Sequence, residues 1–407
     1  MRKAYLPGLL ACLLLLQLSV YGQSIPVPFR VGDKFGIADE SGRMIIKPQF
    51  DWVTVSNLKQ KVLVGYNLKG GTVLSSLIYQ NKILLSNLPY SEYFYTNGLF
   101  VAVKYSITDP TNSNFNDRFV QRDDLFTVDG RKLIDGNFND ITPLDGIEEE
   151  SLRQTLVSTT DSAYRQSLFL YDKVLKKIVK TYFANSKYVE FTNNASVYYK
   201  NRSYTFVFLD EKGIGHQLVI KNDGKALQVV VNKPVNVPPP PPRQHYFDQA
   251  FDFPESVFDN KLTPPTETGS KLIKSYERRG AYYYKPKAKE QLKNGSQLLG
   301  STALVFKDGK IGLEDNGILR IPAVYDDILH GDFEGDSGGY VLRQGNKYQL
   351  YYYSNGKPMV LPTIFDKIPL LISGYFAADA PLIKLYEDNG EFFCFANSTG
   401  KLYYSKQ

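Results

Sequence analysis

The chain has 407 residues, and its 48 Lys and Arg exceed its 42 Asp and Glu to give a net charge of +6. Because the charges are spread along the sequence, they favour solubility and give no signature of nucleic-acid binding. The 30 Tyr and 25 Phe favour the half-buried faces of β-strands. The composition therefore predicts an all-β protein.

The first 22 residues have the pattern of a signal peptide. Arg2 and Lys3 precede an apolar run from Leu9 to Leu16, which is too short to span a bilayer. No other such run follows, so we expect no transmembrane segment in the mature chain. Cleavage before Gln23 predicts an exported protein, which is periplasmic, on the cell surface or secreted.

A lipid anchor is the alternative at this end of the chain. Leu9-Leu10-Ala11-Cys12 is similar to the site at which bacterial lipoproteins are cut and acylated on cysteine. The apolar run continues beyond Cys12 and almost none of it precedes that residue, which favours ordinary secretion. Cys394 is then the only cysteine of the mature chain, so we expect neither an intramolecular disulfide nor a zinc site built on cysteine pairs. We expect no cofactor.

A proline run divides the chain. The prolines from Pro238 to Pro242 cannot donate backbone hydrogen bonds and favour an extended linker. The predicted regions are a signal peptide (1–22), an N-terminal β-repeat region (23–232), a Pro-rich linker with a basic, Tyr-rich segment (233–300) and a C-terminal repeat region (301–407).

Two segments share one internal pattern, Phe29 to Val53 and Val305 to Ile328. Each has a Gly turn, Lys, an apolar residue, Gly, a second polar Gly turn, a strand, Pro, an aromatic residue and Asp. A third copy runs from Leu342 to Ile368, with Gln349 in place of the Gly after the apolar residue. Weaker copies run from Leu125 to Ile141 and from Ile383 to Tyr404.

Each copy is predicted to fold as an antiparallel β-meander. Proline is expected to end its strand, the following aromatic residue to enter the core, and the Asp to accept backbone N–H groups in an Asx-type turn. In the third copy, the alternation of Tyr348, Leu350 and Tyr352 predicts one buried strand face, and Asn355-Gly356 predicts a hairpin turn. The repeat positions singled out are Gly36, Pro48, Phe50, Asp51, Gly312, Pro322, Tyr325, Asp326, Pro362, Phe365 and Asp366.

The pattern resembles the WG-repeat family, also called KWG repeats. The match in the first copy is Lys34-Phe35-Gly36-Ile37, with Gly42, Pro48 and Phe50-Asp51 after it. Lys310-Ile311-Gly312-Leu313 begins the same match in the second copy. Phe35, Ile311 and Tyr348 replace the namesake tryptophan, and the only Trp is Trp52. The resemblance implies an all-β array of stacked repeats, solenoid or propeller-like, without a shared catalytic activity.

Gly335-Asp336-Ser337-Gly338-Gly339 matches the surroundings of the nucleophile in trypsin-like proteases. Such an enzyme needs a histidine base in a defined context. His216, His245 and His330 are the only histidines, and none has that context. Because the repeat pattern places these residues in an insertion before the next strand, we reject the protease interpretation.

Three charged clusters suggest other chemistry. Acids between residues 315 and 336 lack the spacing of a calcium loop and are expected to cap turns, so no metal site is predicted. Glu148 to Glu150 are expected to precede a short helix near Ser151 to Leu156. Bases and tyrosines between residues 271 and 293 are expected to form a solvated linker, with binding of acidic glycans or anionic lipid headgroups as the alternative and no nucleic-acid site.

These patterns predict a non-enzymatic exported WG-repeat protein that presents a β surface to a protein or glycan partner in the bacterial envelope. The alternative is an envelope glycan hydrolase with carboxylates on its repeat loops. Acids that cap their own turns would favour the binding protein, whereas a cleft gathering acids from several repeats would favour the enzyme.

Overall fold

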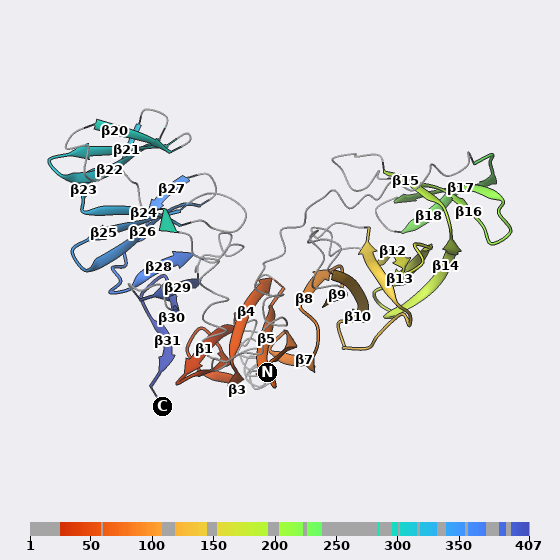
Figure 1. Cartoon of the computed structure of the whole chain (residues 1–407), viewed down its shortest axis with the longest axis horizontal. Coiled ribbons are helices and arrows are strands. Elements are labelled where there is room, and N and C mark those ends of the chain that lie inside the picture. The colour runs from red at the N-terminus through yellow and green to blue at the C-terminus, as the bar shows by residue number, and fades with distance from the viewer. Residues whose placement is uncertain are drawn as a thin grey trace, which may run out of the picture. The chain divides into compact units, whose positions relative to one another are not determined.

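The computed structural model describes residues 25–57, 60–107, 119–144, 153–193, 203–222, 226–237, 283–284, 295–299, 302–315, 318–331, 339–354, 357–371, 382–387 and 392–406. All regular secondary structure in these ranges is β, arranged in six sheets (Figure 1). The all-β prediction is therefore confirmed. The expected helix near residue 154 is wrong, because Gln154–Asp161 forms a strand, β12.

The chain divides into two compact units. Unit 1 consists of residues 1–65, 80–82 and 265–407, and unit 2 of residues 66–79 and 83–264. The residues near the N-terminus therefore group with the C-terminal region. The domain boundaries expected from the sequence stay predictions, and the proline run from Pro238 to Pro242 lies outside the described residues.

A seven-stranded sheet of unit 1 combines the first strands of the chain with the last. Its order is β28-β29-β30-β31-β1-β2-β3. The strands are β28 (Ile368–Leu371), β29 (Leu382–Tyr386), β30 (Phe392–Asn397), β31 (Leu402–Ser405), β1 (Val27–Val31), β2 (Lys34–Ala38) and β3 (Met44–Phe50).

The two ends of the chain meet in this sheet. β1 and β31 pair in parallel, with Arg30 opposite Tyr404 and Val31 opposite Ser405. The Gly32 N–H extends the ladder by donating to the Ser405 carbonyl at 3.2 Å. All other neighbours in the sheet are antiparallel.

Two further sheets belong to unit 1, with orders β20-β21-β22-β23 and β19-β24-β25-β26-β27. Their strands are β20 (Gly295–Leu299), β21 (Thr302–Lys307), β22 (Lys310–Asp315), β23 (Ile318–Tyr325), β19 (Tyr283–Tyr284), β24 (Asp327–Gly331), β25 (Gly339–Gln344), β26 (Lys347–Ser354) and β27 (Lys357–Val360). One hydrophobic core, which includes Leu304, Leu313 and Tyr351, draws on both sheets. Tyr348, Leu350 and Tyr352 are buried as predicted, whereas Asn355-Gly356 lies outside the described residues.

The boundary between the two units falls within a four-stranded sheet of order β4-β5-β6-β7. Its strands are β4 (Trp52–Asn57), β5 (Val62–Lys69), β6 (Thr72–Tyr79) and β7 (Lys82–Leu88).

Unit 2 contains a seven-stranded sheet, β14-β13-β12-β11-β10-β9-β8, and a four-stranded sheet, β15-β16-β17-β18. Apart from β12, the strands are β8 (Glu92–Thr96), β9 (Leu99–Ile107), β10 (Phe119–Thr127), β11 (Phe138–Pro143), β13 (Gln166–Asp172), β14 (Lys177–Ser186), β15 (Val189–Asn193), β16 (Ser203–Leu209), β17 (Gly215–Asn222) and β18 (Leu227–Pro234).

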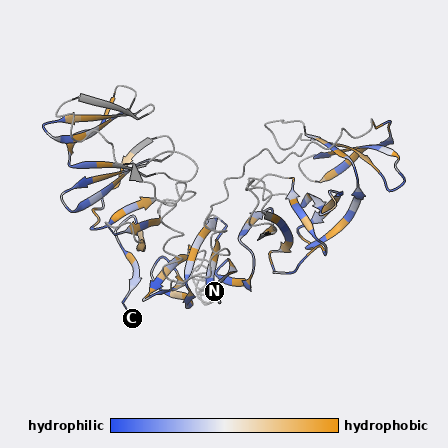
Figure 2. Ribbon diagram, viewed as in Figure 1, coloured by the Kyte–Doolittle hydropathy of each residue, from blue (hydrophilic) through white to orange (hydrophobic). Residues whose placement is uncertain are grey.

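Alternation of side chains explains how these sheets form cores. In β16, every second residue is buried, namely Tyr204, Phe206 and Phe208, and these rings pack against Leu156 and Leu168 from the larger sheet. Figure 2 shows the same interspersing of hydrophobic and hydrophilic residues along the strands of the chain. Period-two alternation buries one face of a strand and leaves the other to solvent.

Candidate functional site

Two glycines of the repeat pattern lie where strands approach too closely for a side chain. A Cβ atom on Gly36 would lie 2.3 Å from the Ile46 carbonyl oxygen, and one on Gly312 would lie 2.5 Å from that of Ile321. The β2–β3 ladder shifts register between Phe35 and Ile37, and the β22–β23 ladder shifts at the matching place. The glycine is therefore required, because a β-bulge at this position brings the third strand of the copy close against the backbone of the second.

The expectation that proline ends the strand is wrong for two of the three copies. Pro48 lies inside β3 and Pro322 inside β23, and each strand continues to its aromatic residue. Both strands lie at an edge of their sheet and carry the bulge, and these are the positions where a strand tolerates proline. In the third copy, Pro362 does follow the last residue of β27, Val360.

The third copy departs from the others where Gln349 replaces glycine. The Gln349 Nε2 donates to the Leu361 carbonyl at 3.4 Å, so a side chain occupies the space that the glycine leaves to the backbone. β27 ends at Val360, and Phe365 returns as an isolated bridge to Tyr348, with N–H to O distances of 2.8 and 2.9 Å. The third strand, which is continuous in the first two copies, is therefore interrupted in the copy that has Gln349 in place of glycine.

The aromatic residues of the pattern enter the core to different degrees. Phe50 and Phe365 are buried, as predicted, whereas Tyr325 is half-buried against the core of its two sheets. Trp52 packs edge-on against Phe35, with ring centroids 4.9 Å apart. The only tryptophan thus lies against the position that the WG-repeat family fills with tryptophan.

The Asp after each aromatic residue pairs with a base from the same copy. Lys34 Nζ lies 2.6 Å from Asp51, Lys310 Nζ lies 2.5 Å from Asp326, and Lys347 pairs with Asp366. Just before the weaker copy from Leu125 to Ile141, Arg122 donates to Asn139, which follows Phe138 as Asp51 follows Phe50.

The predicted Asx-type turn is wrong for Asp326. This carboxylate accepts the N–H of Gly345, 19 residues along the chain in the following hairpin, at 2.7 Å. That hydrogen bond, followed by the one from Lys310, holds the pKa of Asp326 below its usual value. The residue links one hairpin to the next instead of capping its own turn.

Five hairpin loops share one geometry. In each, the first residue donates its N–H to the fifth residue's carbonyl, and the fourth donates to the first residue's carbonyl. The fourth residue is left-handed in every loop, and it is Gly in all but one, where Tyr164 has φ 59°. The loops are residues 39–43, 127–131, 161–165, 210–214 and 397–401.

The first side chain of these loops caps its own loop. Asp161 accepts the N–H groups of Ala163 and Arg165, each at 2.8 Å, and Asn397 accepts those of Thr399 and Lys401. Asp210 accepts those of Lys212 and Ile214, and Asp39 accepts that of Arg43. Burial opposes ionisation of Asp161, but the hydrogen bonds and the charge of Arg165 outweigh it and lower its pKa. These carboxylates are engaged in hydrogen bonds that hold their own loops.

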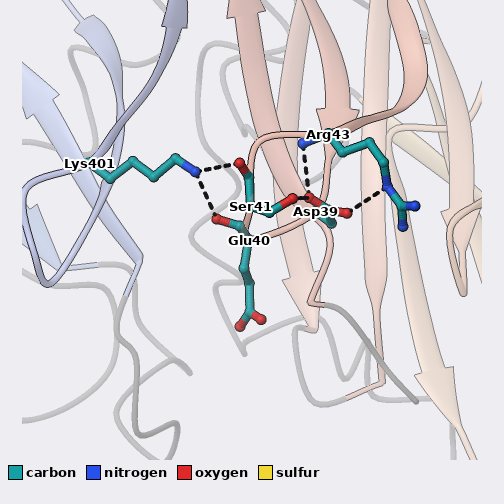
Figure 3. A network of polar contacts seen from close by, with 5 residues as sticks. All are labelled: Asp39, Glu40, Ser41, Arg43 and Lys401. Atoms are coloured by element: carbon teal, nitrogen blue, oxygen red, sulfur yellow. Dashed lines mark hydrogen bonds and ion pairs between the residues drawn. The ribbon is translucent and has the colours of Figure 1, made fainter. Parts of the chain in front are cut away.

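Two of these loops are bonded to each other across the junction of the chain ends (Figure 3). Lys401 Nζ donates to the carbonyls of Glu40 at 3.3 Å and Ser41 at 2.5 Å, and the Tyr403 hydroxyl donates to the Glu40 carbonyl at 3.2 Å. Figure 3 shows the Glu40 carboxylate directed away from Lys401. The pair of loops, residues 39–43 and 397–401, is called the loop rim below. It presents exposed charges of both signs on Glu40, Arg43 and Lys401.

Arg30 holds the same junction from within the sheet. Its Nη1 donates to the Phe393 carbonyl at 2.7 Å and to the Phe392 carbonyl at 3.3 Å, while Nε donates to Gly32 at 2.9 Å. One side chain of β1 therefore bonds to the backbone of β30. The sequence offered no signal for this role, because nothing local marks a partner some 363 residues away.

A second group of acids lies in unit 2. Asp123 on β10 is only 3% exposed. It accepts the Ile141 N–H at 3.0 Å, and both of its carboxylate oxygens lie within hydrogen-bond distance of Gln121 Nε2. Burial, together with repulsion from Asp140 and Asp124, raises its pKa to about 7. Glu92 lies in the same cross-strand row, separated from Asp123 by Val103, and burial raises its pKa as well. No sequence motif marks these acids as a group.

The residues of the rejected protease site are not brought together in any described part of the chain. Ser337 lies outside the described residues, and His330 belongs to β24. His216 enters β17 after its hairpin loop, as expected, and bonds to Asp210 at 3.0 Å. Glu148 to Glu150 and the basic segment 271–293, apart from Tyr283 and Tyr284, also lie outside the described ranges.

Within the ranges described above, no group of three or more His, Cys, Asp or Glu side chains is placed to hold a metal ion. A search of the same residues for a helix long and apolar enough to cross a membrane finds none.

Comparisons with known proteins give no family assignment. No protein-family model matches the chain, and no curated protein matches it. Among solved structures, a eukaryotic initiation factor has 10% identity and a TM-score of 0.27, with 94% of this chain and 97% of that chain covered. The β-propeller domain of the Trilobed protease from Pyrococcus furiosus has 7% identity and a TM-score of 0.25, with 93% and 98% covered. A prolyl endopeptidase has 10% identity and a TM-score of 0.24, and this chain spans 55% of its length. TM-scores this low carry no inference about function.

Proposed function

We propose that the chain is an exported, non-enzymatic repeat protein of the WG type that binds a protein or glycan partner in the bacterial envelope. The observation that carries the proposal is the use of its loop carboxylates. Asp39, Asp161 and Asp210 accept N–H groups of their own loops, and the Asp residues of the repeat pattern pair with lysines. Acids engaged in this way stabilise loops and are not available for general acid or base catalysis.

The repeat interpretation is supported by geometry that recurs in separate parts of the chain. The base-to-Asp pair, the glycine under a bulge and the five-residue loop each occur more than once, with the same hydrogen bonds. A unit of this kind cannot bury its apolar faces alone, and stacking against neighbours supplies the missing core. A propeller-like array of such units is the fold that we propose.

The loop rim is the proposed contact surface. Loops held by several hydrogen bonds present side chains in fixed positions, and this lowers the entropy cost of binding. Lys401 joins the two loops through backbone carbonyls, and the side chains of Glu40 and Arg43 are exposed, with Arg43 Nε paired to Asp39 at 3.0 Å. Charges of both signs suit a polar protein surface or a charged glycan.

The test is capture of partners from envelope extract by the purified chain. Wild type is expected to recover a specific protein or glycan, and Glu40→Lys with Arg43→Glu to lose it. Lys212→Glu, at an exposed loop position of unit 2, is the matched control and is expected to leave capture unchanged. The proposal fails if no specific partner is recovered while the purified chain cleaves envelope glycan.

The alternative of a glycan hydrolase rests on the acids of unit 2. A buried carboxyl with a raised pKa is a frequent feature of active sites, and Asp123 has one. Asp123→Asn decides the matter, because a hydrolase using this acid would lose its activity, whereas partner capture would persist in a binding protein.

Export is tested separately by cell fractionation. The chain is expected in the periplasm, at the surface or in the medium, with Gln23 at its N-terminus. Labelling by a fatty acid that Cys12→Ser abolishes would establish the lipid anchor instead.

A further inference from the structure

The hairpin that joins β13 to β14 in unit 2 exposes apolar side chains at its tip. Val174 is 70% exposed and Leu175 is 49% exposed, and they are adjacent in the sequence. Val179, on the edge strand β14, is exposed as well. Single exposed apolar residues are ordinary, but two neighbours exposed at one turn make a larger exposed apolar area.

The tip is held in one conformation by a buried acid. Asp172 is 2% exposed and accepts the N–H groups of Val174 and Leu175, each at 3.0 Å. Arg153 donates to the same carboxylate at 2.8 Å and accepts the Lys173 N–H through its carbonyl. These hydrogen bonds fix the conformation of the turn in the free protein, and the charge of Asp172 is buried.

Bases surround the apolar tip. Lys176 lies in the turn, Lys177 and Lys180 follow on β14, and Arg131 reaches the turn by donating to the Lys176 carbonyl. Asp129, an exposed acid of the neighbouring loop, is paired with Lys176 at 3.3 Å. The hairpin from Gln166 to Ser186 and the side chains bonded to its turn carry six bases against two acids, an excess of four positive charges, from Arg131, Arg153, Lys173, Lys176, Lys177, Lys180, Asp129 and Asp172.

We propose that this hairpin tip docks onto the surface of an anionic lipid bilayer, with Val174 and Leu175 entering the headgroup region and the lysines contacting lipid phosphates. Apolar side chains surrounded by Lys and Arg are suited to the boundary between headgroups and acyl chains. Each Lys or Arg near an anionic surface adds a further attraction that salt screens. The site is independent of the loop rim, so either proposal can fail without the other.

An acidic protein or a nucleic acid fits the same surface less well. Lysines alone would serve either partner, but neither one offers a soft apolar layer to two side chains at the tip of a turn. A rigid protein partner would need a pocket to receive them. The apolar pair therefore separates the lipid surface from the other anionic partners.

The experiment measures co-sedimentation with vesicles. The chain from Gln23 onward is used, so that the apolar leader contributes nothing. Vesicles of phosphatidylcholine alone are compared with vesicles of equal parts phosphatidylcholine and phosphatidylglycerol. Binding is expected only to the second kind and to weaken as salt is raised.

Two double variants test the two parts of the site. Lys177→Glu with Lys180→Glu is expected to lower affinity for anionic vesicles by about 30-fold or more, given about tenfold per 1.4 kcal/mol and about 1 kcal/mol per base. Val174→Ser with Leu175→Ser is expected to lower it by about tenfold, through lost burial of apolar area. The far-ultraviolet spectrum and the unfolding midpoint confirm that each variant is folded.

The loop at residues 210–214 supplies the control. It also exposes an apolar residue, Ile214, and a base, Lys212, but it carries the acids Asp210 and Glu211. Ile214→Ser with Lys212→Glu is expected to leave vesicle binding unchanged. The proposal is overturned if wild type does not bind anionic vesicles, if the control weakens binding as much as the tip variants, or if only the lysine variant weakens it. The last result would mean that the lysines bind the anionic surface by charge alone, without entry of Val174 and Leu175 into the headgroup region.

Discussion

At the scale of single residues, Gly36 shows how a short pattern encodes a tertiary requirement. The sequence marks it as one Gly in a repeated motif, and the structure supplies the reason, the carbonyl of Ile46 where its Cβ would be. Gly36→Ala is expected to lower the free energy of unfolding of unit 1 by about 1–3 kcal/mol, since the backbone must move to admit a methyl group. Gly309→Asn is the control, because Gly309 has open space around it and Asn tolerates its left-handed φ of 76°. Thermal unfolding midpoints that fall equally in both variants would refute the packing explanation.

Asp123 provides a second prediction at this scale, about pH. Its pKa is about 7 in the folded protein, against 3.8 for an ordinary Asp. Between these values the folded protein keeps a proton that the unfolded chain releases, so its contribution makes stability fall as pH rises, by up to about 1.4 kcal/mol per unit. Asp123→Asn removes this dependence, and the variant is expected to gain on wild type as pH rises from 4 toward 7. The loop acids Asp39 and Asp161 have lowered pKa values and act in the opposite direction below that window. Parallel curves for variant and wild type, from chemical unfolding across pH, would show that Asp123 does not titrate in this way.

At the scale of elements, the five-residue hairpin loop is the part of the fold that local sequence predicts best. An Asp, Asn or Thr followed three residues later by Gly supplies both the capping oxygen and the left-handed residue. The second polar Gly turn of the repeat pattern is this loop in Asp39 to Arg43, with Gly42 at φ 86°. The expected end at Pro48 is wrong at the next strand, β3, which continues to Phe50. A strand tolerates proline when it lies at the edge of a sheet, and the residues of the strand do not indicate its position in the sheet.

One of the five loops has no glycine at the left-handed position, and this exception can be tested. Tyr164 holds the left-handed position that Gly occupies in the other four loops, at a cost of about 1 kcal/mol or more. Tyr164→Gly is expected to be neutral or to stabilise unit 2 by up to about 1 kcal/mol, because the relieved strain exceeds the entropy that glycine adds to the unfolded chain. Gly213→Ala, in the matching position with open space around it, is expected to destabilise by about 1 kcal/mol. Opposite signs in urea unfolding would support the shared geometry, and equal signs would contradict it.

At the scale of the whole molecule, the sequence does not predict the pairing of β1 with β31. The pattern indicated that both ends carry related copies, but no local feature marks a parallel ladder between Arg30 and Tyr404. Such contacts join residues far apart in the sequence, so they are identified only by the fold. The same holds for Arg30, whose partners on β30 are identified only by the fold.

The junction of the two ends has a consequence for unit 1 alone. Deleting residues 401–407 removes β31 and Lys401, so β1 and β30 lose their shared neighbour and Arg30 loses the strand that places it beside Phe393. Unpaired strand edges and an opened core follow, and the unit that holds both ends is expected to lose protection from amide hydrogen exchange. Unit 2, built from residues between these ends, is expected to keep its protection in β12 and β13. Lys401→Ala, which keeps the ladder and removes only the loop contact, should produce a smaller loss confined to residues 39–43. Equal loss of protection in both units after the deletion would mean that the chain unfolds as one cooperative body, and the junction would then stabilise the whole molecule instead of one unit.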